Sequence, residues 1–234
     1  MALEAKTRRL PAPPEVDPDL DASDPDAIGR DAIIGDFRFR ALMSEDDWAR
    51  LPPATRRRFS KRLAGGESAV YVGEVEEVSF SRIGWWLAQI ARLIGGPLPT
   101  GRDTGVPAIV TVTEDAATGG QVWTRIYARR NGFPQVIHSS KRFEGSTGLE
   151  EYLGFGIGMA LRMRVEGEAL LFCSAGYFLH VGPLRLRLPA LLTPGGLTVS
   201  HSDFGGQFRF RLELVHPRFG TLVRQSGTFK EATS

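Results

Sequence analysis

Hydrophobic and polar residues alternate strictly in the second half of the chain. Between residues 208 and 214, large apolar residues occupy every second position, and Arg209, Arg211 and Glu213 occupy the positions between them. A period of two is typical of a β-strand with one buried face and one solvated face. Similar runs recur at 159–166 and 184–188. The pattern predicts an antiparallel sheet that curls around an apolar interior.

The same pattern, with turn residues between the runs, predicts ten strands along the chain. They span residues 68–80, 108–114, 121–129, 133–143, 150–166, 170–180, 184–188, 197–202, 207–216 and 222–230. Because that many strands can close on themselves, the predicted fold is mainly β, an antiparallel β-barrel or strongly curved half-barrel with two or three peripheral helices. The proline-bounded segment 189–194 is expected to form a turn or a single helical turn at the rim.

Helical spacing and capping residues predict helices at 44–48, 54–63 and 81–94, the first and third capped by Ser44 and Ser81. The third helix contains Trp85 and Trp86, which point to different sides because they are adjacent. We favour a helix packed across a barrel mouth with Trp85 partly covered. The alternative is a peripheral membrane contact, for which this helix offers only Arg82 and Arg92 as cations.

Composition divides the chain into two parts. Residues 1–35 are rich in proline and aspartate and are predicted to be a disordered leader, and residues 36–232 are predicted to form one domain. The 29 basic and 27 acidic residues nearly balance, which argues against nucleic acid as a partner. The basic cluster at 56–62 is interpreted as a solvated helix face rather than a phosphate site.

Cys173 is the single cysteine, so no intrachain disulfide can form, and we expect it to be buried. No stretch approaches the roughly 20 apolar residues of a membrane-spanning helix. With no signal peptide recognised, a reducing, cytoplasmic location is the expectation.

Motifs for catalysis or cofactor binding are weak. Gly154, Gly156 and Gly158 follow the spacing G-x-G-x-G without a strand-turn-helix context, so we interpret them as strand glycines at a bend or close approach. The four histidines (His138, His180, His201 and His216) show no zinc-like spacing. We therefore assign no catalytic residue, no metal site and no cofactor.

The segment 121–129 carries the most suggestive pattern. Trp123, Arg125 and Tyr127 share one face, and an aliphatic, core-like face lies opposite. If the aromatic face lines a cavity, Arg125 could hold a carboxylate or phosphate between the two rings. We favour the other arrangement, in which this face is outside and Arg125 extends over exposed aromatics.

Further motifs follow one another in a fixed order along most of the chain. They are Leu51-Pro-Pro53, the Trp85–Trp86 helix, Val122-Trp-Thr-Arg125, Gly154-Phe-Gly156, the alternating run 159–165, Gly182-Pro183, Gly206-Gln-Phe208-Arg-Phe210 and Gly227. In this order the chain resembles the bacterial DUF4166 family of domains of unknown function over roughly residues 39–230. The resemblance implies an architecture but no established activity, and its glycines and prolines transfer no catalytic residue. Some family members carry the domain behind a saccharopine-dehydrogenase-like reductase module, which implies a link to small-molecule redox metabolism.

These observations lead to one leading hypothesis and two alternatives. The leading hypothesis is a domain that binds a small apolar or amphipathic, lipid-like molecule in a barrel cavity. Its candidate ligand-binding residues are Trp123, Arg125, Tyr127, His180 and His201. The first alternative is a cofactor-free acid-base enzyme in which His180 or His201 lies near Arg125. The second is a non-catalytic partner of a separate NAD(P)-dependent reductase.

Overall fold

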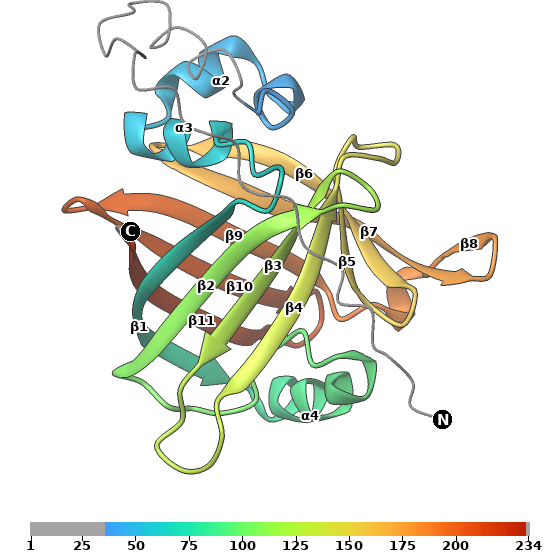
Figure 1. Cartoon of the computed structure of the whole chain (residues 1–234). Coiled ribbons are helices and arrows are strands. Elements are labelled where there is room, and N and C mark those ends of the chain that lie inside the picture. Colours follow the sequence, from blue (N-terminus) through green and yellow to red (C-terminus); the bar gives the residue numbers. More distant parts are fainter. Residues whose placement is uncertain (1–35, 233–234) are drawn as a thin grey trace, which may run out of the picture. The chain divides into compact units, whose positions relative to one another are not determined.

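Ten antiparallel strands close into a β-barrel in the computed structural model, which describes residues 36–232 apart from the side chain of Phe204 (Figure 1). The strands follow the ring order β6-β5-β4-β3-β2-β1-β11-β10-β9-β7, and pairing of β6 with β7 closes the ring. The predicted barrel is confirmed in its closed form. The predicted leader, residues 1–35, lies outside the described residues.

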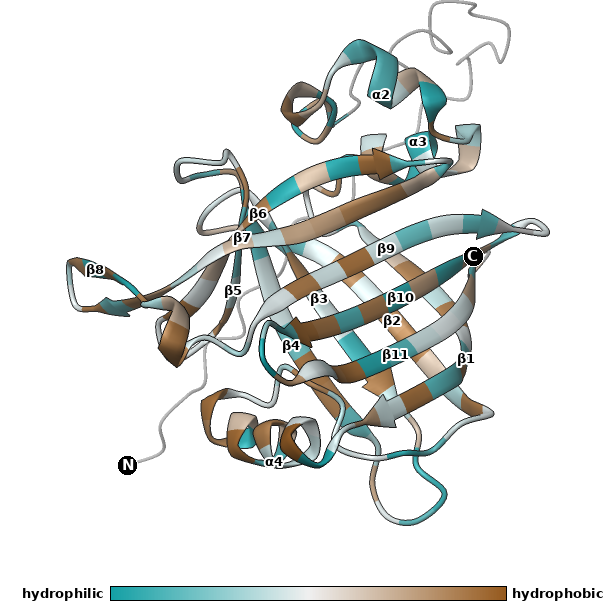
Figure 2. Cartoon of the chain, turned by 180° about the vertical axis from the view of Figure 1, so that it is seen from behind, coloured by the Kyte–Doolittle hydropathy of each residue, from teal (hydrophilic) through white to brown (hydrophobic). Residues whose placement is uncertain are grey.

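The eleven strands of the described chain match most of the predicted segments. They are β1 (Ser68–Phe80), β2 (Val106–Asp115), β3 (Gly120–Tyr127), β4 (Gln135–Arg142), β5 (Glu150–Gly154), β6 (Ile157–Glu166), β7 (Ala169–Val181), β8 (Leu184–Arg187), β9 (Gly196–Phe204), β10 (Gln207–His216) and β11 (Gly220–Glu231). On β10 the predicted apolar face is buried and the charged face lies outside. The bands of alternating colour along β9 to β11 in Figure 2 show this pattern.

The prediction of a single strand over 150–166 was wrong. The segment forms two strands, β5 and β6, that pair with each other through Glu151↔Met159 and neighbouring positions. Phe155 adopts a left-handed φ of 51° at the turn, between Gly154 and Gly156, whose φ values are 120° and 76°. These two glycines make a tight reversal that the period-two pattern does not reveal, because the alternation continues on both sides of it.

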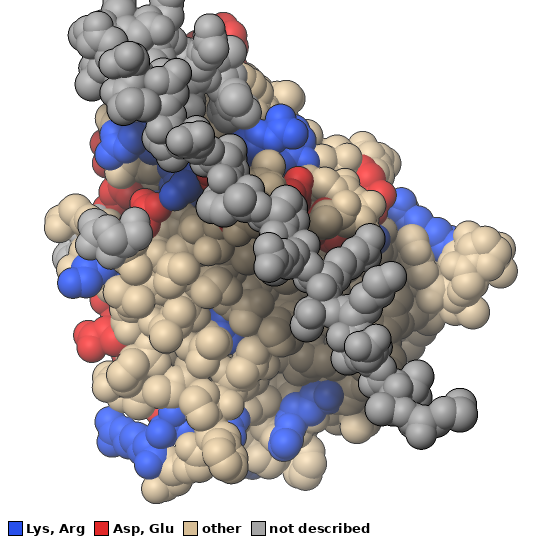
Figure 3. All heavy atoms as spheres, in the orientation of Figure 1, with Lys and Arg blue, Asp and Glu red and all other residues tan. Residues whose placement is uncertain are grey.

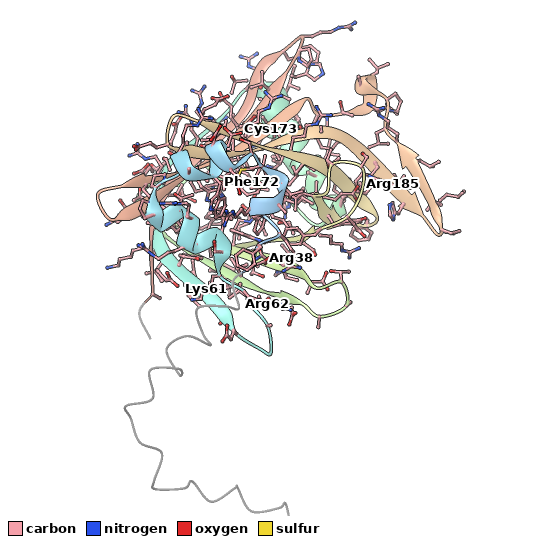
Figure 4. The ribbon with its side chains drawn as sticks, turned by 90° about the horizontal axis from the view of Figure 1, so that it is seen from above. Arg38, Lys61, Arg62, Phe172, Cys173 and Arg185 are labelled. Carbon is pink, nitrogen blue, oxygen red and sulfur yellow. The ribbon has the colours of Figure 1, made fainter. Side chains whose placement is uncertain are left out.

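Strand β7 has different partners along its length. Its first part, Leu170–Cys173, pairs with β9 inside the barrel, and its last part, Phe178–Val181, pairs with β8. Strand β8 therefore projects beside the barrel with Arg185 on it (Figure 4). Neighbouring residues Phe172 and Cys173 of β7 differ in burial: Phe172 is fully buried and Cys173 only half-buried, so the prediction of a buried cysteine was wrong.

One end of the barrel is covered by α2 (Glu45–Arg50) and α3 (Pro53–Ser60), which follow the 3₁₀ turn η1 (Arg40–Leu42). We call this the closed end. As predicted, Ser44 caps α2 by accepting a hydrogen bond from the Asp47 amide at 3.1 Å. Helix α3 ends at Ser60, three residues earlier than predicted, because Lys61 is already extended.

Aromatic rings fill the barrel beneath α3. Phe59 lies against Phe39 and Phe172, with ring centroids 5.4 and 5.5 Å apart. From the predicted basic cluster, Arg58 does not lie on the solvated face: its guanidinium stacks over Phe208 at 3.9 Å and pairs with Asp203 at 3.4 Å. The barrel interior at the closed end is therefore a packed core.

At the opposite end, which we call the open end, lie α4 (Arg82–Ala91), η2 (Arg92–Ile94) and η3 (Ala190–Leu192). Ser81 caps α4 as predicted, accepting a hydrogen bond from Gly84 at 3.0 Å. Helix α4 approaches β11 so closely that a Cβ on Gly84 would lie 1.8 Å from the Leu222 carbonyl oxygen. Trp85 is 36% exposed and Trp86 is 63% exposed, so α4 buries neither ring. No helix within residues 36–232 has the length and hydrophobicity to cross a membrane.

Candidate functional site

A cavity of about 320 Å³ occupies the barrel interior at the open end. Its wall combines side chains of β3, β5, β6, β7, β9 and β10 with α4, η2 and η3. The apolar lining residues are Leu87, Ile90, Ala91, Ile94, Pro97, Leu98, Leu153, Ile157, Met159, Leu188, Leu191, Leu192, Pro194, Leu197, Val199, Leu212 and Leu214. The polar ones are Arg125, Glu151, Tyr177 and Thr193. A volume near 300 Å³, a mostly apolar wall and a few polar groups are typical of small-molecule sites.

Three charged side chains from adjacent strands meet in the interior. Lys141 Nζ lies 3.3 Å and Arg125 Nη2 lies 3.7 Å from the same oxygen, Oε1 of Glu151. Lys141 and Glu151 face each other directly in the β4–β5 register, and Arg125 reaches them from β3. All three are at least mostly buried, so two cations share one carboxylate in a place that water barely reaches.

Burial and neighbouring charges shift the ionisation of this cluster. Burial alone would raise the pKa of Glu151, but the positive charges of Lys141 and Arg125 outweigh it and hold that pKa below the ordinary value. Burial lowers the pKa of Lys141; Glu151 opposes the shift and the charge of Arg125 adds to it. The lowered Lys141 pKa therefore reflects mainly the loss of water around its ammonium group, with a smaller contribution from the charge of Arg125.

Arg125 has an unused hydrogen-bond donor. Its Nη2 donates to Ser139 Oγ, while its buried Nε has no hydrogen-bond partner among residues 36–232. An unpaired donor on a buried cation is costly, and an anion or a carbonyl oxygen would satisfy it. Arg125 thus lines the cavity with spare capacity to bind a negatively charged or polar group.

The face of β3 that carries Trp123, Arg125 and Tyr127 points into the barrel, contrary to the arrangement favoured from the sequence. Trp123 and Tyr127 are buried and Arg125 lines the cavity, whereas Val122, Thr124 and Ile126 on the other face are only half-buried. The favoured arrangement, with Arg125 outside, was wrong. Alternation alone could not identify the inner face, because both faces carry apolar side chains and the ion partners of Arg125 come from other strands.

Trp123 and Tyr127 do not themselves line the cavity. Trp123 Nε1 donates to Gln121 Oε1 at 3.2 Å, and Lys141 Nζ lies 4.6 Å from the centre of the Trp123 ring. Burial raises the pKa of Tyr127, which hydrogen-bonds to Gln225. Trp123 thus packs beside the charged cluster, and Tyr127 pairs with Gln225 of β11. The two rings are packing partners of Arg125 in this structure.

His201 lies in the interior, but among aromatic rings. Its ring is 5.3 Å from that of Phe59 and 5.8 Å from that of Phe172, and Trp123, Phe208 and Phe210 also surround it. Burial, followed by the charges of Arg58, Lys141 and Arg125, lowers the pKa of His201 well below its ordinary value. His201 is therefore a neutral core residue.

His180 lies on the face of β7 opposite Tyr177. Its ring packs against Phe178 at 5.2 Å and Tyr152 at 5.7 Å. His138 lies on the outer side of β4 beside Thr124, and His216 stacks on Phe219 at the end of β10. None of these four histidines, all within the described residues, lines the cavity. The interior thus brings together Arg125, Trp123, Tyr127 and His201 but not His180.

The sequence analysis missed Lys141, Glu151 and Tyr177. Tyr177 lines the cavity, and burial raises its pKa to about 12, so its hydroxyl is a neutral hydrogen-bonding group. A signal for the other two existed: opposite charges facing each other across paired strands stabilise a sheet. Recognising the Lys141–Glu151 pair requires the register between β4 and β5. The predicted single strand over 150–166 did not define that register, because it missed the turn that ends β5.

Comparison with known proteins adds a family but no relative with a described activity. No curated protein and no solved structure matches the chain. The model of one family, described as a domain of unknown function, matches residues 51–229, which include all the strands of the barrel and the cavity wall. The chain belongs to this family, DUF4166.

Proposed function

We propose that this domain binds a small amphipathic molecule with an anionic head group, its apolar part in the cavity and its acid group at Arg125. The observation that carries the proposal is an aliphatic cavity whose only charged lining residues within 36–232 are Arg125 and Glu151. A long apolar wall selects a hydrocarbon-like body, since burying it releases water from apolar surface on both partners.

The charged cluster supports an anion rather than a cation as the head group. With all three groups ionised, Arg125, Lys141 and Glu151 carry one more positive than negative charge, and Arg125 Nε still lacks a partner. A carboxylate or phosphate would accept from this donor and offset the extra charge, which the surrounding core cannot do. A cationic head group would meet two buried cations and be repelled.

The acid-base enzyme has less support. That hypothesis needs a proton carrier beside the bound ligand, and the cavity wall contains no histidine among its described residues. Glu151, the remaining candidate base, is held as a carboxylate by Lys141 and Arg125, which weakens it as a proton acceptor. We therefore propose binding rather than catalysis.

Native mass spectrometry and lipid extraction of the purified protein test the proposal, together with displacement of a fluorescent C18 fatty acid. We expect a bound species and saturable displacement at one ligand per chain. Arg125→Met should weaken fatty-acid binding by about 10- to 100-fold, as loss of a hydrogen bond to a charged group does. Arg211→Met, which removes an exposed arginine from the outer face of β10, is the matched control and should leave binding unchanged.

Two results would overturn the proposal. The first is a wild-type protein with no bound species and no saturable displacement. The second is an Arg125→Met variant that binds the fatty acid as tightly as the Arg211→Met variant does. Circular dichroism and thermal unfolding of both variants separate a lost binding contact from a lost fold.

A further inference from the structure

The open end exposes large apolar side chains next to the cavity mouth. Trp86, Ile90 and Leu93 on α4 and η2 are 63%, 61% and 77% exposed, and Leu191 and Leu192 on η3 are 81% and 70% exposed. Ile90, Leu191 and Leu192 also line the cavity, so the two groups belong to one rim. We call these five residues the rim patch. In Figure 2, much of α4 is brown, which marks hydrophobic residues, whereas α2 at the closed end is largely teal, which marks hydrophilic ones.

The β5–β6 turn extends the rim patch. A Cβ on Gly154 would lie 2.9 Å from the Ile94 carbonyl oxygen, so this turn touches the end of η2. Phe155, at the tip of the turn, is 78% exposed. In contrast, Phe37 is the single exposed large apolar residue in the described segments of the closed end. Clustered apolar exposure of this kind marks an interaction surface rather than ordinary surface variation.

The segments that connect strands at the open end are also uniform in charge. Apart from the β8 hairpin beside the barrel, whose Arg185 pairs with Glu150, these segments contain Arg82, Arg92, Arg102, Arg129, Arg130 and Arg218 within the described residues, with Asp103 as their only acidic residue. The closed end mixes both signs, with acidic residues such as Glu45, Asp46 and Asp47 among its arginines. On the face shown in Figure 3, blue residues lie at the lower end, and most of the red lies above them.

An apolar patch surrounded by arginines fits the interface of an anionic bilayer. Tryptophan, leucine and isoleucine enter the boundary between head groups and acyl chains, and each arginine near the surface of an anionic leaflet adds electrostatic attraction to it. A protein partner of ordinary mixed charge would leave most of these arginines unpaired. Helix α4 and η2 offer Arg82 and Arg92, and the barrel topology brings four more arginines to the same end.

We infer that the open end docks on anionic membranes through the rim patch, so that the cavity mouth faces the bilayer from which the ligand enters. This inference rests on the proposed function for the identity of the ligand, and it adds the source of that ligand. An amphiphile with its head group in the interface could pass into the cavity without exposing its apolar part to water. The mouth and the docking surface share residues, so docking and ligand entry use one opening.

Flotation of the full chain with lipid vesicles tests the docking. We expect the protein to float with vesicles of phosphatidylcholine and phosphatidylserine (7:3) and much less with phosphatidylcholine alone. The double variant Trp86→Ser/Leu93→Ser should bind the anionic vesicles about tenfold or more weakly, because two exposed apolar side chains of the rim patch would be lost from the bilayer contact. Phe37→Ser, an exposed aromatic at the closed end, is the matched control and should bind as the wild type does.

Charge variants provide a second test of membrane docking. Arg92→Glu on the open end should weaken binding to the anionic vesicles several-fold, whereas Arg62→Glu, exposed at the closed end, should not. Wild-type protein that stays unbound to both kinds of vesicle would overturn the docking inference. Equal losses in Arg92→Glu and Arg62→Glu would do so as well, since they would show a diffuse charge effect.

The same variants distinguish failure of docking from failure of the proposed function. In solution, the Trp86→Ser/Leu93→Ser variant should still take up the fluorescent fatty acid, because neither side chain lines the cavity. A wild type that binds the fatty acid but no vesicles would refute docking and leave the proposed function standing. A wild type that binds vesicles but no fatty acid would refute the proposed function, and with it the role of docking in ligand entry.

Discussion

The two ends of the barrel differ in how far their apolar side chains are buried. At the closed end, Phe39 and Phe59, the latter on α3, are buried against Phe172. At the open end, α4 and η3 keep Trp86 and Leu191 exposed and leave a cavity behind them. Each end is covered by short helical segments, yet aromatic rings fill the barrel interior at the closed end, whereas a cavity remains inside it at the open end. The hollow of about 540 Å³ at the closed end lies between α3 and the ends of β10 and β11.

The difference shows how one fold separates stability from binding. Burying aromatic rings to crystal-like density stabilises the domain, and it leaves no room for a ligand. The open end lacks that packing and keeps apolar surface exposed. Covering this surface with a ligand or a membrane stabilises the resulting complex. The charged cluster of Arg125, Lys141 and Glu151 lies between the two regions and polarises the inner end of the cavity.

The largest expected effect is on the closed end. Phe59→Ala should lower the free energy of unfolding by about 3–5 kcal/mol, because it empties a fully buried site between three rings. Phe37→Ala at the same end, where the ring is exposed, should change it by no more than about 0.5 kcal/mol. Urea unfolding followed by tryptophan fluorescence measures both. Similar values for the two variants would contradict a packed closed end.

Acid should destabilise the closed end through His201. Its pKa is lowered in the folded state, so below about pH 6.5 the unfolded chain binds a proton that the folded chain does not. Stability should then fall as pH falls from 6.5 toward 5, by up to about 1.4 kcal/mol per pH unit.

His201→Phe removes that proton and should flatten this part of the stability curve. Urea unfolding of both proteins at several pH values between 5 and 7 provides the comparison. If the variant and the wild type lose stability with the same slope, His201 is not the group that titrates.

Ligand affinity should depend on pH through Lys141. A bound anion raises the lowered Lys141 pKa, so the protonated form binds the anion more tightly. Affinity for the fatty acid should therefore fall as pH rises through the lowered Lys141 pKa, that is, below the ordinary lysine range, at most about tenfold per pH unit.

Lys141→Met should bind the fatty acid more weakly on the acid side of the wild-type transition and lose this pH dependence below pH 10.5. Displacement titrations of both proteins measure the effect. A wild type whose affinity stays constant over this range would show that Lys141 does not sense the head group.

The smallest expected effect is on the stability of the open end. Leu192→Ser should change the free energy of unfolding by no more than about 0.5 kcal/mol, because the side chain is mostly exposed. It should still weaken fatty-acid binding a few-fold, because Leu192 lines the cavity. A loss of stability as large as that of Phe59→Ala would remove the distinction between the two ends.

Much of the fold could be predicted from the sequence, because local rules determine it. Alternation located β1 and β10 at their observed bounds, and serine caps located the starts of α2 and α4. The inner face of β3 could not be predicted, since its choice depends on ion partners from β4 and β5. The β5–β6 turn was missed because only its backbone, with a left-handed Phe155, departs from a strand.

For the candidate site, too, the local sequence pattern indicated some residues, and only the sheet register showed the others. Arg125 could be named from one strand, but Lys141 and Glu151 become its neighbours only through the sheet register. The arginine-rich open end is likewise invisible along the chain, because its members are spread from Arg82 to Arg218. A local motif such as the Trp85–Trp86 pair showed that something was unusual there, without showing the surrounding charge.

The central claim is that the barrel holds an anionic amphiphile with its acid group at Arg125. Carbon-13 NMR of a fatty acid labelled at its carboxyl carbon tests it directly, by titrating the bound carboxyl with pH. We predict a bound signal whose carboxyl pKa lies below that of the free acid in wild type and rises in Arg125→Met, because the guanidinium favours the ionised form. No bound signal, or a bound carboxyl that titrates identically in both proteins, would contradict the account.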